Sequence, residues 1–480
     1  MRRVREDAPA GEGLDYESFI RAKHLTREDE GFAPTRAFNA RLFPFQRDVT
    51  AWGLRRGRFA VFAERGLGKT LQQLEWSRHC ALETGAPSLV LAPLAVAHQT
   101  AREGAKFGIP VTVCQTGGDV RAGVNVTNYD RLGDFDPGAF GAVALDESSI
   151  LKAYMGATKR ALVTAFAATP YRSCWTATPA PNDHVELGNH AEFLGIMPSP
   201  EMLSRWFIND TMAMGKYRLK GHAEADFWAW VASWAVSLRR PSDLGAEYSD
   251  EGYVLPPLRV EHIAVDVDIL AGRGDDALFR DPSLSATNVH AEMRRTAPAR
   301  AEAVAALVRA EPAEPWIAWC NTDYEADELL ARLPGAAEVR GSQPLAAKEE
   351  RLARFLDGRA RVLIGKPSML GYGLNLQHCA RAAFVGLSYS FEQFYQALGR
   401  VYRFGQAREV HAYVIGARTE AAAAATVARK AQDHERMLDA MVAHSRAAQD
   451  QRRAGLQLSA AAGDRPMRLP AWLRTAEGVQ

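Results

Sequence analysis

The stretch from residue 61 to residue 70 sets the strongest limit on how this chain can fold. Its apolar start, residues 61–63, predicts the end of a buried strand, and a helix is predicted over residues 70–78. Between them, Gly66 and Gly68 form a turn in which backbone amides can approach a phosphate closely. Because the N-terminus of the following helix also attracts anions, this order of parts predicts a phosphate-binding loop.

Two polar side chains at the end of this loop match the chemistry of a bound triphosphate. Lys69 supplies a positive charge for the β and γ phosphates, and the Thr70 hydroxyl can bind a magnesium ion. The general pattern is G-x-x-x-x-G-K-[ST], and its first position is Ala63 here. The match is therefore incomplete, and an ordinary strand–turn–helix with a surface lysine is the alternative reading of this stretch alone.

A glutamine stands ahead of the loop, next to a helix predicted over residues 47–54. The amide of Gln46 both donates and accepts hydrogen bonds, so it can grip the edge of an adenine. A plain helix-start residue is the alternative at this position.

Short apolar runs alternate with predicted helices through most of the chain. Such runs indicate buried parallel strands, and their alternation with helices indicates an α/β fold with doubly wound parallel sheets. Strands are predicted at residues 61–63, 88–93, 111–113, 124–127, 142–147 and 173–179, and again at 316–320, 337–340, 360–364, 383–387 and 409–415.

An aromatic segment separates these two groups of strands. Phe227, Trp230 and Trp234 recur at helical spacing, which favours a buried helical core over a base-stacking platform. Pro256 and Pro257 exclude a helix and predict an extended hinge. The predicted organisation is a leader (1–40), a first sheet domain (41–190), a helical protrusion (191–252), the hinge (253–260), a second sheet domain (261–447, helical from 421) and a mobile tail (448–480).

Two adjacent carboxylates end the strand predicted at residues 142–147. Ligands of such sheets bind at the carboxyl ends of the strands, so Lys69, Asp146 and Thr178 are expected to meet there. Behind a phosphate loop, Asp146 would hold the magnesium ion, and Glu147 would orient and deprotonate an attacking water. An isolated Asp-Glu pair is common, so this interpretation depends on the loop and strand that precede it.

The most specific stretch lies in the second half, at residues 396–406. Arg400 and Arg403 are three residues apart, which on a helix places both on one face. From there they can reach across a cleft to a γ phosphate, where an arginine finger is worth roughly 10³–10⁵ in rate. For an isolated arginine pair, a solvated basic helix face is the alternative.

Composition sets the broad class of the protein. The chain has 480 residues, 47% of them hydrophobic and 24% charged, with a net charge of +1, so contacts with nucleic acid must come from local basic faces. No apolar run approaches the roughly 18 residues of a membrane span, and the charged start lacks a secretory signal. The five scattered cysteines indicate small core residues in a reducing compartment, and the expected location is the cytoplasm.

The motifs, taken in this order, resemble those of the superfamily 2 helicases and translocases, and most closely their Snf-type branch of DNA-dependent ATPases. That family's phosphate loop often begins with alanine, as it does at Ala63. The stretch 396–406, the run 255–257 and the pair 239–240 resemble the Snf-type branch in particular. The resemblance covers roughly residues 41–440 and implies two tandem RecA-like domains with a helical protrusion between them. No chromatin-reading module is visible, which favours a compact bacterial or phage member.

The resemblance implies a role for each motif residue. ATP and Mg²⁺ would be held by Gln46, Gly66, Gly68, Lys69, Thr70, Asp146 and Gly373, and hydrolysis would use Glu147, Gln396, Arg400 and Arg403. Thr176 and Thr178 would couple hydrolysis to movement. The nucleic-acid backbone would contact Pro93, Thr127, Asn128, Lys152, Ser368 and Asn375, with a solvated lysine as the alternative for Lys152.

The leading interpretation is an ATP-dependent translocase that moves along duplex DNA by salt-sensitive phosphate contacts. A strand-separating DNA or RNA helicase is the alternative, as is the motor subunit of a nuclease or methylase complex, with replication or repair proteins as further partners. An ATP-binding scaffold without turnover is disfavoured, because the lysine, both carboxylates and both arginines are present. The acidic motif reads Asp-Glu-Ser-Ser at residues 146–149 instead of the common Asp-Glu-Ala-His, and it keeps both carboxylates.

Overall fold

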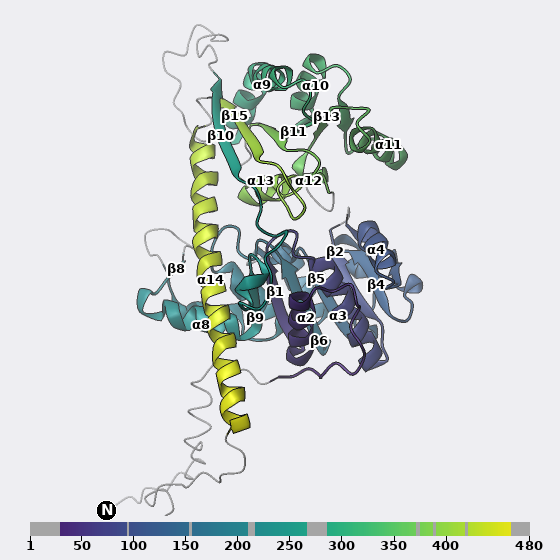
Figure 1. The fold of residues 1–480 in the computed structure, drawn as a ribbon, viewed down its shortest axis with the longest axis vertical. Coiled ribbons are helices and arrows are strands. Elements are labelled where there is room, and N and C mark those ends of the chain that lie inside the picture. Colours follow the sequence, from purple (N-terminus) through teal and green to yellow (C-terminus); the bar gives the residue numbers. More distant parts are fainter. Residues whose placement is uncertain are drawn as a thin grey trace, which may run out of the picture.

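Two parallel β-sheets form the centres of two domains, which lie one above the other along the long axis of the molecule (Figure 1). The computed structural model describes residues 29–93, 96–152, 156–209, 217–265, 286–370, 375–386, 390–417 and 421–461. Within these ranges every pairing inside the two large sheets is parallel. The predicted α/β class with two doubly wound domains is confirmed.

The N-terminal sheet has the described strands in the order β3-β4-β2-β5-β6-β1-β9. Along β1, side chains alternate between the two faces, so Ala60 and Phe62 join one core cluster while Phe59 and Val61 join the other. The strands are β1 (Arg58–Ala63), β2 (Ser88–Ala92), β3 (Val111–Val113), β4 (Val124–Asn128), β5 (Ala142–Asp146), β6 (Tyr171–Thr176) and β9 (Ala235–Leu238).

The C-terminal sheet has the described strands in the order β10-β15-β14-β11-β13-β12. It too is buried on both faces, which explains why its central strands are continuous apolar runs. The strands are β10 (Leu258–Val265), β11 (Trp316–Cys320), β12 (Ala337–Val339), β13 (Val362–Gly365), β14 (Arg381–Val385) and β15 (Val410–Ala417).

Helices cover both faces of each sheet, as a parallel sheet requires. In the N-terminal domain they are α2 (Pro44–Arg56), α3 (Lys69–Thr84), α4 (Ala97–Lys106), α5 (Ala157–Ala165), α6 (Glu186–Leu194), α7 (Ser199–Trp206) and α8 (Glu224–Trp234). In the C-terminal domain they are α9 (Ala286–Ala310), α10 (Asp323–Arg332), α11 (Leu345–Leu356), α12 (Pro367–Leu370) and α13 (Phe391–Leu398), followed by α14 (Ala421–Ala461). No helix in the described ranges combines the length and the apolar character needed to cross a membrane.

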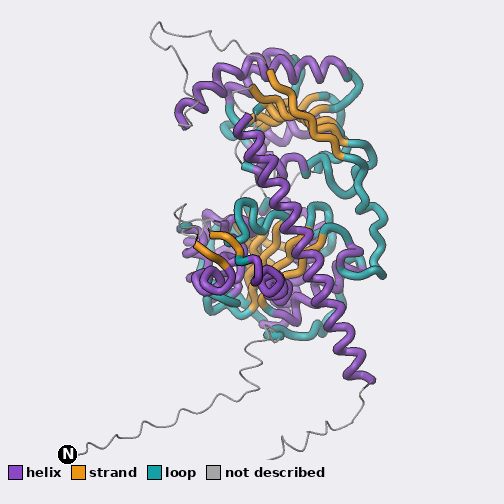
Figure 2. The backbone as a smooth tube through the Cα atoms, turned by 90° about the vertical axis from the view of Figure 1, so that its left-hand side faces the viewer, coloured by secondary structure: helices purple, strands orange, loops and turns teal. Residues whose placement is uncertain are grey.

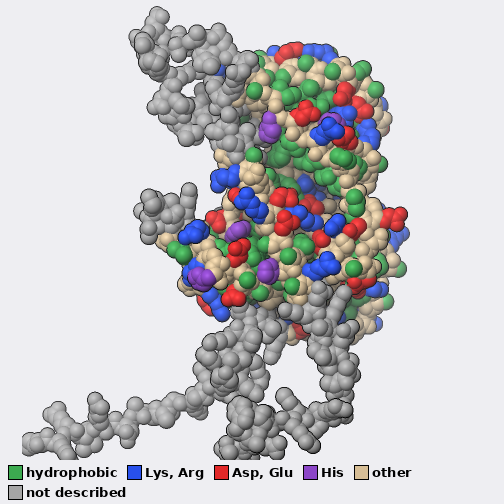
Figure 3. Space-filling model, turned by 60° about the vertical axis from the view of Figure 1, so that its left-hand side comes forward, with side chains coloured by type: hydrophobic (Ala, Val, Ile, Leu, Met, Phe, Trp, Pro, Cys, Tyr) green, Lys and Arg blue, Asp and Glu red, His purple; other side chains and the backbone are tan. Residues whose placement is uncertain are grey.

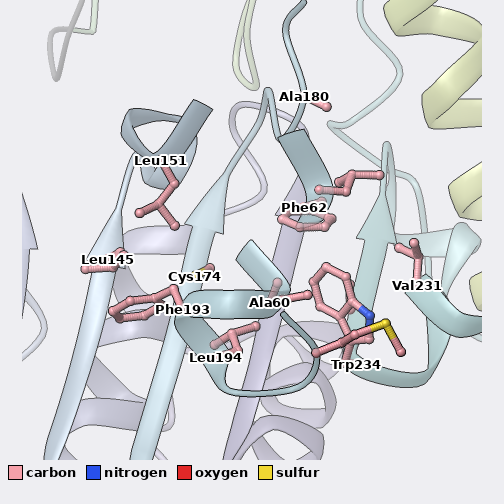
Figure 4. Close-up of a cluster of buried hydrophobic side chains, with 14 of the residues drawn as sticks. Ala60, Phe62, Leu145, Leu151, Cys174, Ala180, Phe193, Leu194, Val231 and Trp234 are labelled. Atoms are coloured by element: carbon pink, nitrogen blue, oxygen red, sulfur yellow. The ribbon is translucent and has the colours of Figure 1, made fainter. Parts of the chain in front are cut away.

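The aromatic segment packs on the N-terminal sheet. Helix α8 buries Phe227, Trp230 and Trp234 completely or nearly so, and Trp230 stacks on Trp206 of α7 at 4.7 Å between ring centroids. Figure 4 shows Trp234 beside Phe62 of β1. The aromatic stripe is therefore core, as its spacing predicts.

The segment predicted as a helical protrusion, residues 191–252, also contains strands. A short antiparallel hairpin, β7 (Phe207–Asn209) with β8 (Tyr217–Leu219), projects from it. After α8 the chain enters β9, which pairs in parallel with β1 at the edge of the N-terminal sheet. The helical prediction is wrong for these residues, because they form a hairpin and a strand that pairs with β1.

We expect Trp230→Ala to lower the free energy of unfolding of the N-terminal domain by about 3–5 kcal/mol, because it removes a fully buried indole and leaves a cavity. Denaturant titration followed by tryptophan fluorescence and circular dichroism measures the change. Ile208→Ala, at a 45% exposed position of β7, is the control and should change stability little. Equal losses in the two variants would show that Trp230 is not part of the structural core.

Helix α14 runs alongside both domains (Figures 1 and 2). It contacts β15 and α13 of the C-terminal domain and packs on α8 and β9 of the N-terminal domain. Met437, Leu438 and Met441 belong to the N-terminal core, and Arg239 pairs with Glu435 at 2.6 Å. The helix predicted over residues 421–447 extends to Ala461, into the segment expected to be a mobile tail.

Candidate active site

The phosphate-binding loop connects the end of β1 to the start of α3. Gly66 and Gly68 have φ angles of 88° and 74°, a region that side chains with a Cβ atom rarely adopt. Gly68 is the cap residue at the N-terminus of α3, and a glycine has no side chain with which to cap the helix. Its first backbone amides are therefore available to an anion, as the sequence predicts.

Lys69 turns back onto the loop that carries it. Its Nζ donates hydrogen bonds to the carbonyl oxygens of Ala63, at 2.6 Å, and Glu64, at 3.2 Å. Burial lowers the pKa of Lys69, while the carboxylates of Glu147 and Asp146 oppose that shift. The ammonium group thus lies between the loop and the acidic pair, where a β or γ phosphate can replace its carbonyl partners.

Gln46 lies directly against the phosphate-binding loop. Its Nε2 donates to the carbonyl oxygen of Leu67 at 2.9 Å, and its Oε1 accepts from the backbone amide of Phe43 at 3.0 Å. A Cβ atom on Gly68 would lie 2.2 Å from this Nε2, so the second loop glycine is required for contact with the glutamine as well as for backbone shape. Recognition of adenine by Gln46 remains a prediction.

The acidic pair lies at the carboxyl end of β5. Burial, and then the charge of Glu147, raises the pKa of Asp146 to about 7. Burial also raises the pKa of Glu147, against the opposing charges of Lys69 and Arg400. A positive charge close to two buried carboxylates favours their ionised forms, and Lys69 and Arg400 supply such charges here.

Glu147 also has an unusual backbone. Its φ angle of 49° is the one positive value among the non-glycine residues that the structure describes. A residue with a side chain in this region carries strain, and such strain concentrates where a functional side chain must be aimed. Here it separates the direction of Glu147 from that of Asp146, so that neighbouring residues can serve different groups.

Gln396 of α13 connects the acidic pair to an arginine of the other domain. Its Nε2 donates to Oε2 of Glu147 at 3.2 Å, and its Oε1 accepts from Nη2 of Arg400 at 3.3 Å. Arg400 is 7% exposed, and its positive charge opposes the rise in the pKa of Asp146 and of Glu147 that burial causes. The predicted second half of the site therefore meets the first half directly.

The two arginines reach the cleft from a turn. Helix α13 ends at Leu398, so the prediction that Arg400 and Arg403 share a helix face is wrong. The turn is held by Gln406, whose Nε2 donates to the carbonyl oxygens of Gln377, Cys379 and Val401 at 2.9–3.1 Å. The glutamine at the end of the 396–406 stretch thus fixes the path of the arginine segment.

Arg403 lies over the phosphate-binding loop. Burial, and then the charge of Arg65 in the loop, lowers the pKa of its guanidinium. Next to it, Phe404 packs so closely on the loop that a Cβ atom on Gly66 would lie 2.8 Å from Cβ of Phe404. A meeting of Lys69 and Arg403 around a phosphate group remains a prediction.

Three residues at this contact were not predicted. Glu64 and Arg65 of the phosphate-binding loop both bind Tyr395 of α13: its hydroxyl donates to Glu64 and its carbonyl oxygen accepts from Arg65. The Arg65 guanidinium also lies 3.5 Å from the centre of the Tyr395 ring. Although burial opposes ionisation of Glu64, Arg65 and Tyr395 lower its pKa. A partial signal existed, because Tyr395 precedes Gln396 on the helix that serves the site.

The proposed coupling residues follow β6. Thr176 and Thr178 are fully buried, and the amide of Thr178 donates to Oγ1 of Thr176 at 3.1 Å. The Thr178 hydroxyl is buried without a hydrogen-bond partner within the described part of the chain. A buried hydroxyl without a hydrogen-bond partner costs free energy in this arrangement.

The predicted nucleic-acid contacts fall into two groups. Thr127 is buried, and its hydroxyl donates a hydrogen bond to the carbonyl oxygen of Cys114. The side-chain oxygen of Asn128 accepts a hydrogen bond from the backbone amide of Asp130. Both side chains therefore stabilise the fold in this structure. The others are at least partly exposed at the carboxyl ends of strands or beyond them: Pro93, Lys152, Ser368 and Asn375. Gly373 lies outside the described residues.

Comparisons with known proteins bear on the C-terminal domain. Residues 299–405 match the family model of the helicase conserved C-terminal domain. No curated protein matches the sequence. One similar solved structure is the Sulfolobus solfataricus SWI2/SNF2 ATPase core in complex with dsDNA, with 17% identity, a TM-score of 0.40 and coverage of 80% of this chain and 90% of that chain.

The matched region contains Gln396, Arg400 and Arg403, the residues that approach the phosphate-binding loop from the second domain. The first domain supplies that loop and the acidic pair. The match to the helicase conserved C-terminal domain therefore includes the residues that the second domain contributes to the site between the two parallel sheets.

Proposed function

We propose that the chain is an ATP-dependent translocase that moves along duplex DNA. The observation that carries the proposal is the hydrogen bond between Gln396 and Glu147, at 3.2 Å, which joins the two halves of a nucleotide site across the cleft. A site divided between two domains is suited to converting hydrolysis into domain movement, because the bound nucleotide determines how closely the halves approach.

The residues fit a magnesium triphosphate. Thr70 and Asp146 offer hard oxygen ligands beside the phosphate-binding loop, and a magnesium ion typically uses one or two such groups with phosphate oxygens and water. When bound, the ion would neutralise charge on the β and γ phosphates. Burial is the first cause of the raised pKa of Asp146, and a cation bound beside this carboxylate would favour its charged form.

Each protein group then has a defined task. Lys69 and the amides of the loop hold the phosphates, and Glu147 orients the attacking water and accepts its proton. Gln396 positions Glu147, while Arg400 and Arg403 stabilise the charge that develops on the transferred phosphoryl group. Departure of the products removes the charge that attracts these arginines, and the two domains can separate.

Duplex DNA is the proposed track. The Leu-Pro-Pro run at residues 255–257, the pair 239–240 and the stretch 396–406 resemble Snf-type translocases. Lys152, Ser368 and Asn375 are exposed and belong to both domains, which suits a backbone gripped by each domain in turn. Figure 3 shows Lys and Arg interspersed with Asp and Glu on one face, so contact with DNA would depend on local groups.

We expect duplex DNA to stimulate ATP turnover more strongly than single-stranded DNA or RNA. Turnover is measured with each polymer at matched nucleotide concentration, beside a strand-displacement assay. Stimulation should fall steeply as salt rises, because phosphate contacts release counterions. Stimulation by RNA alone would contradict the proposal, and efficient strand displacement would favour a helicase that separates strands.

A further inference from the structure

A second polar contact crosses the cleft beside the catalytic groups. Glu392, in the first turn of α13, accepts hydrogen bonds from Oγ of Ser149 at 2.6 Å and from Nζ of Lys152 at 2.5 Å. Both donors lie in the short 3₁₀ helix at Ser148–Lys152, directly after Glu147. One carboxylate of the C-terminal domain therefore holds the segment that carries the acidic pair.

This carboxylate shares a helix face with the residues that serve the site. Glu392, Tyr395 and Gln396 are spaced by three and four positions, so their side chains leave α13 on the same side. The hydrogen bonds from Ser149 and Lys152 to Glu392 therefore help to fix where Gln396, on the same face of α13, contacts Glu147. The Glu392 charge also contributes to the raised pKa of Glu147, behind burial.

The three members differ in their access to solvent. The Glu392 and Ser149 residues are 8% and 3% exposed, whereas the Lys152 side chain is 42% exposed. An ion pair with one solvated partner is open to competition, and a phosphate diester is an anion that a lysine binds well. A nucleic-acid backbone that reaches Lys152 would compete with Glu392 for its ammonium group.

We propose that Glu392 is a positioning residue that restrains the two domains until a nucleic-acid phosphate takes Lys152 from it. This inference rests on the proposed function, because it identifies the release of the restraint with binding of the track. While Glu392 holds Ser149 and Lys152, the domains keep the spacing seen here. When Lys152 turns to a phosphate, Glu392 keeps one hydrogen bond instead of two, and α13 can move relative to Glu147.

The N-terminal domain provides a matched control. Glu192 accepts from Nζ of Lys159 at 2.7 Å and also from Oγ of Ser199, which repeats the combination of serine, lysine and glutamate. All three residues belong to one domain, at α5, α6 and α7. Glu192→Gln therefore disturbs a similar cluster without touching the contact between domains.

The test compares ATP turnover of the full chain and of Glu392→Gln, with and without duplex DNA. We expect the substitution to raise the DNA-free rate about fivefold or more and to lower the stimulation factor correspondingly. Glu192→Gln should leave both quantities at wild-type values. An unchanged DNA-free rate in Glu392→Gln, or an equal rise in Glu192→Gln, would overturn the proposal.

A charge exchange separates the ion pair from other effects of the side chains. Lys152→Glu alone should raise the DNA-free rate, and the double variant Lys152→Glu with Glu392→Lys should return it to within about twofold of the wild type. The double variant should respond more weakly to DNA, since a glutamate at position 152 cannot be drawn to a phosphate. If the DNA-free rate of the double variant is as high as that of Lys152→Glu alone, the proposed pairing of Lys152 with Glu392 is overturned.

A measurement without nucleotide keeps this inference separate from the proposed function. Dyes on Leu82→Cys and Leu356→Cys, at positions 55% and 48% exposed in different domains, report the distance between the domains by energy transfer, and the native cysteines are buried. Glu392→Gln should broaden or shift the distance distribution without DNA, and an unchanged distribution would overturn the restraint. A different outcome is a shifted distance distribution in Glu392→Gln without stimulation of turnover by any polymer. The restraint by Glu392 would then stand, and the assignment of duplex DNA as the polymer along which the protein moves would fail.

Discussion

Replacing Glu147 by glutamine is expected to reduce ATP turnover by roughly 10²–10⁴, the usual contribution of a positioned general base. The amide has almost the shape of the carboxylate but cannot accept the proton of the attacking water. Lys69 and the glycine loop are unchanged, so nucleotide binding should persist. Turnover is measured at saturating DNA and ATP, and binding is measured separately with a fluorescent ATP analogue.

Two features of the structure make this test specific. Glu147 is held by Gln396 and lies in a strained backbone, with φ of 49°, so its carboxylate has a defined direction. Glu201→Gln, at an exposed position of α7, is the control and should turn over at the wild-type rate. A wild-type rate in Glu147→Gln would refute its role as the base and would direct attention to Asp146, whose pKa is raised to about 7 chiefly by burial.

Replacing Arg403 by alanine is expected to lower turnover by roughly 10³–10⁵, the range for an arginine that stabilises a transferring phosphoryl group. Arg403 lies beside Phe404, which rests on Gly66 of the phosphate-binding loop. The fall should appear mainly in kcat, because the charge that the guanidinium stabilises develops in the transition state. Steady-state kinetics over a range of ATP concentrations separates this effect from weaker binding.

A matched arginine in the same segment serves as the control. Arg408 pairs with Glu314 at 2.8 Å on the outside of the C-terminal domain, so Arg408→Ala should retain wild-type turnover. Arg403→Lys should recover only part of the activity, since a lysine keeps the charge without the planar donor group. Loss of activity in both alanine variants would indicate damage to the turn, and a wild-type rate in Arg403→Ala would leave Arg400 as the arginine that acts on the phosphate.

Most of the fold could be predicted because its strands are continuous apolar runs bounded by glycine, proline or polar residues. The strand that carries Val61 and the strand that ends at Asp146 both lie where the sequence places them. Strand β9 could not be predicted. It is only four residues long and follows a tryptophan-rich helix, and its local sequence carries no sign of pairing with β1. Its pairing is decided by contacts between segments distant in sequence.

The active site was predictable to the extent that its residues recur in ordered motifs. Lys69, Asp146, Glu147, Gln396 and Arg400 come together as expected. The predicted helical path of the arginines was wrong because α13 ends at Leu398 and a turn follows it. In that turn Arg65 lies so close to Gly399 that a Cβ atom there would lie 2.0 Å from Nη1 of Arg65. The pairing of Arg65 with Tyr395 follows from how the two domains meet, which no pattern within either motif expresses.

Helix α14 has a mechanical consequence for the proposed function. The two sheets are connected covalently between β9 and β10 and are held a second time where α14 packs on both β15 and β9. Because both connections lie at the β9 and β10 edges of the two sheets, they define an axis there. A movement of one domain relative to the other would then be a rotation about this axis. Displacement then grows across each sheet from the β9 and β10 edges and is largest at β3 and β12, the opposite edges. Under the proposed function, a small rotation near α14 would therefore produce a larger displacement at β3 and β12.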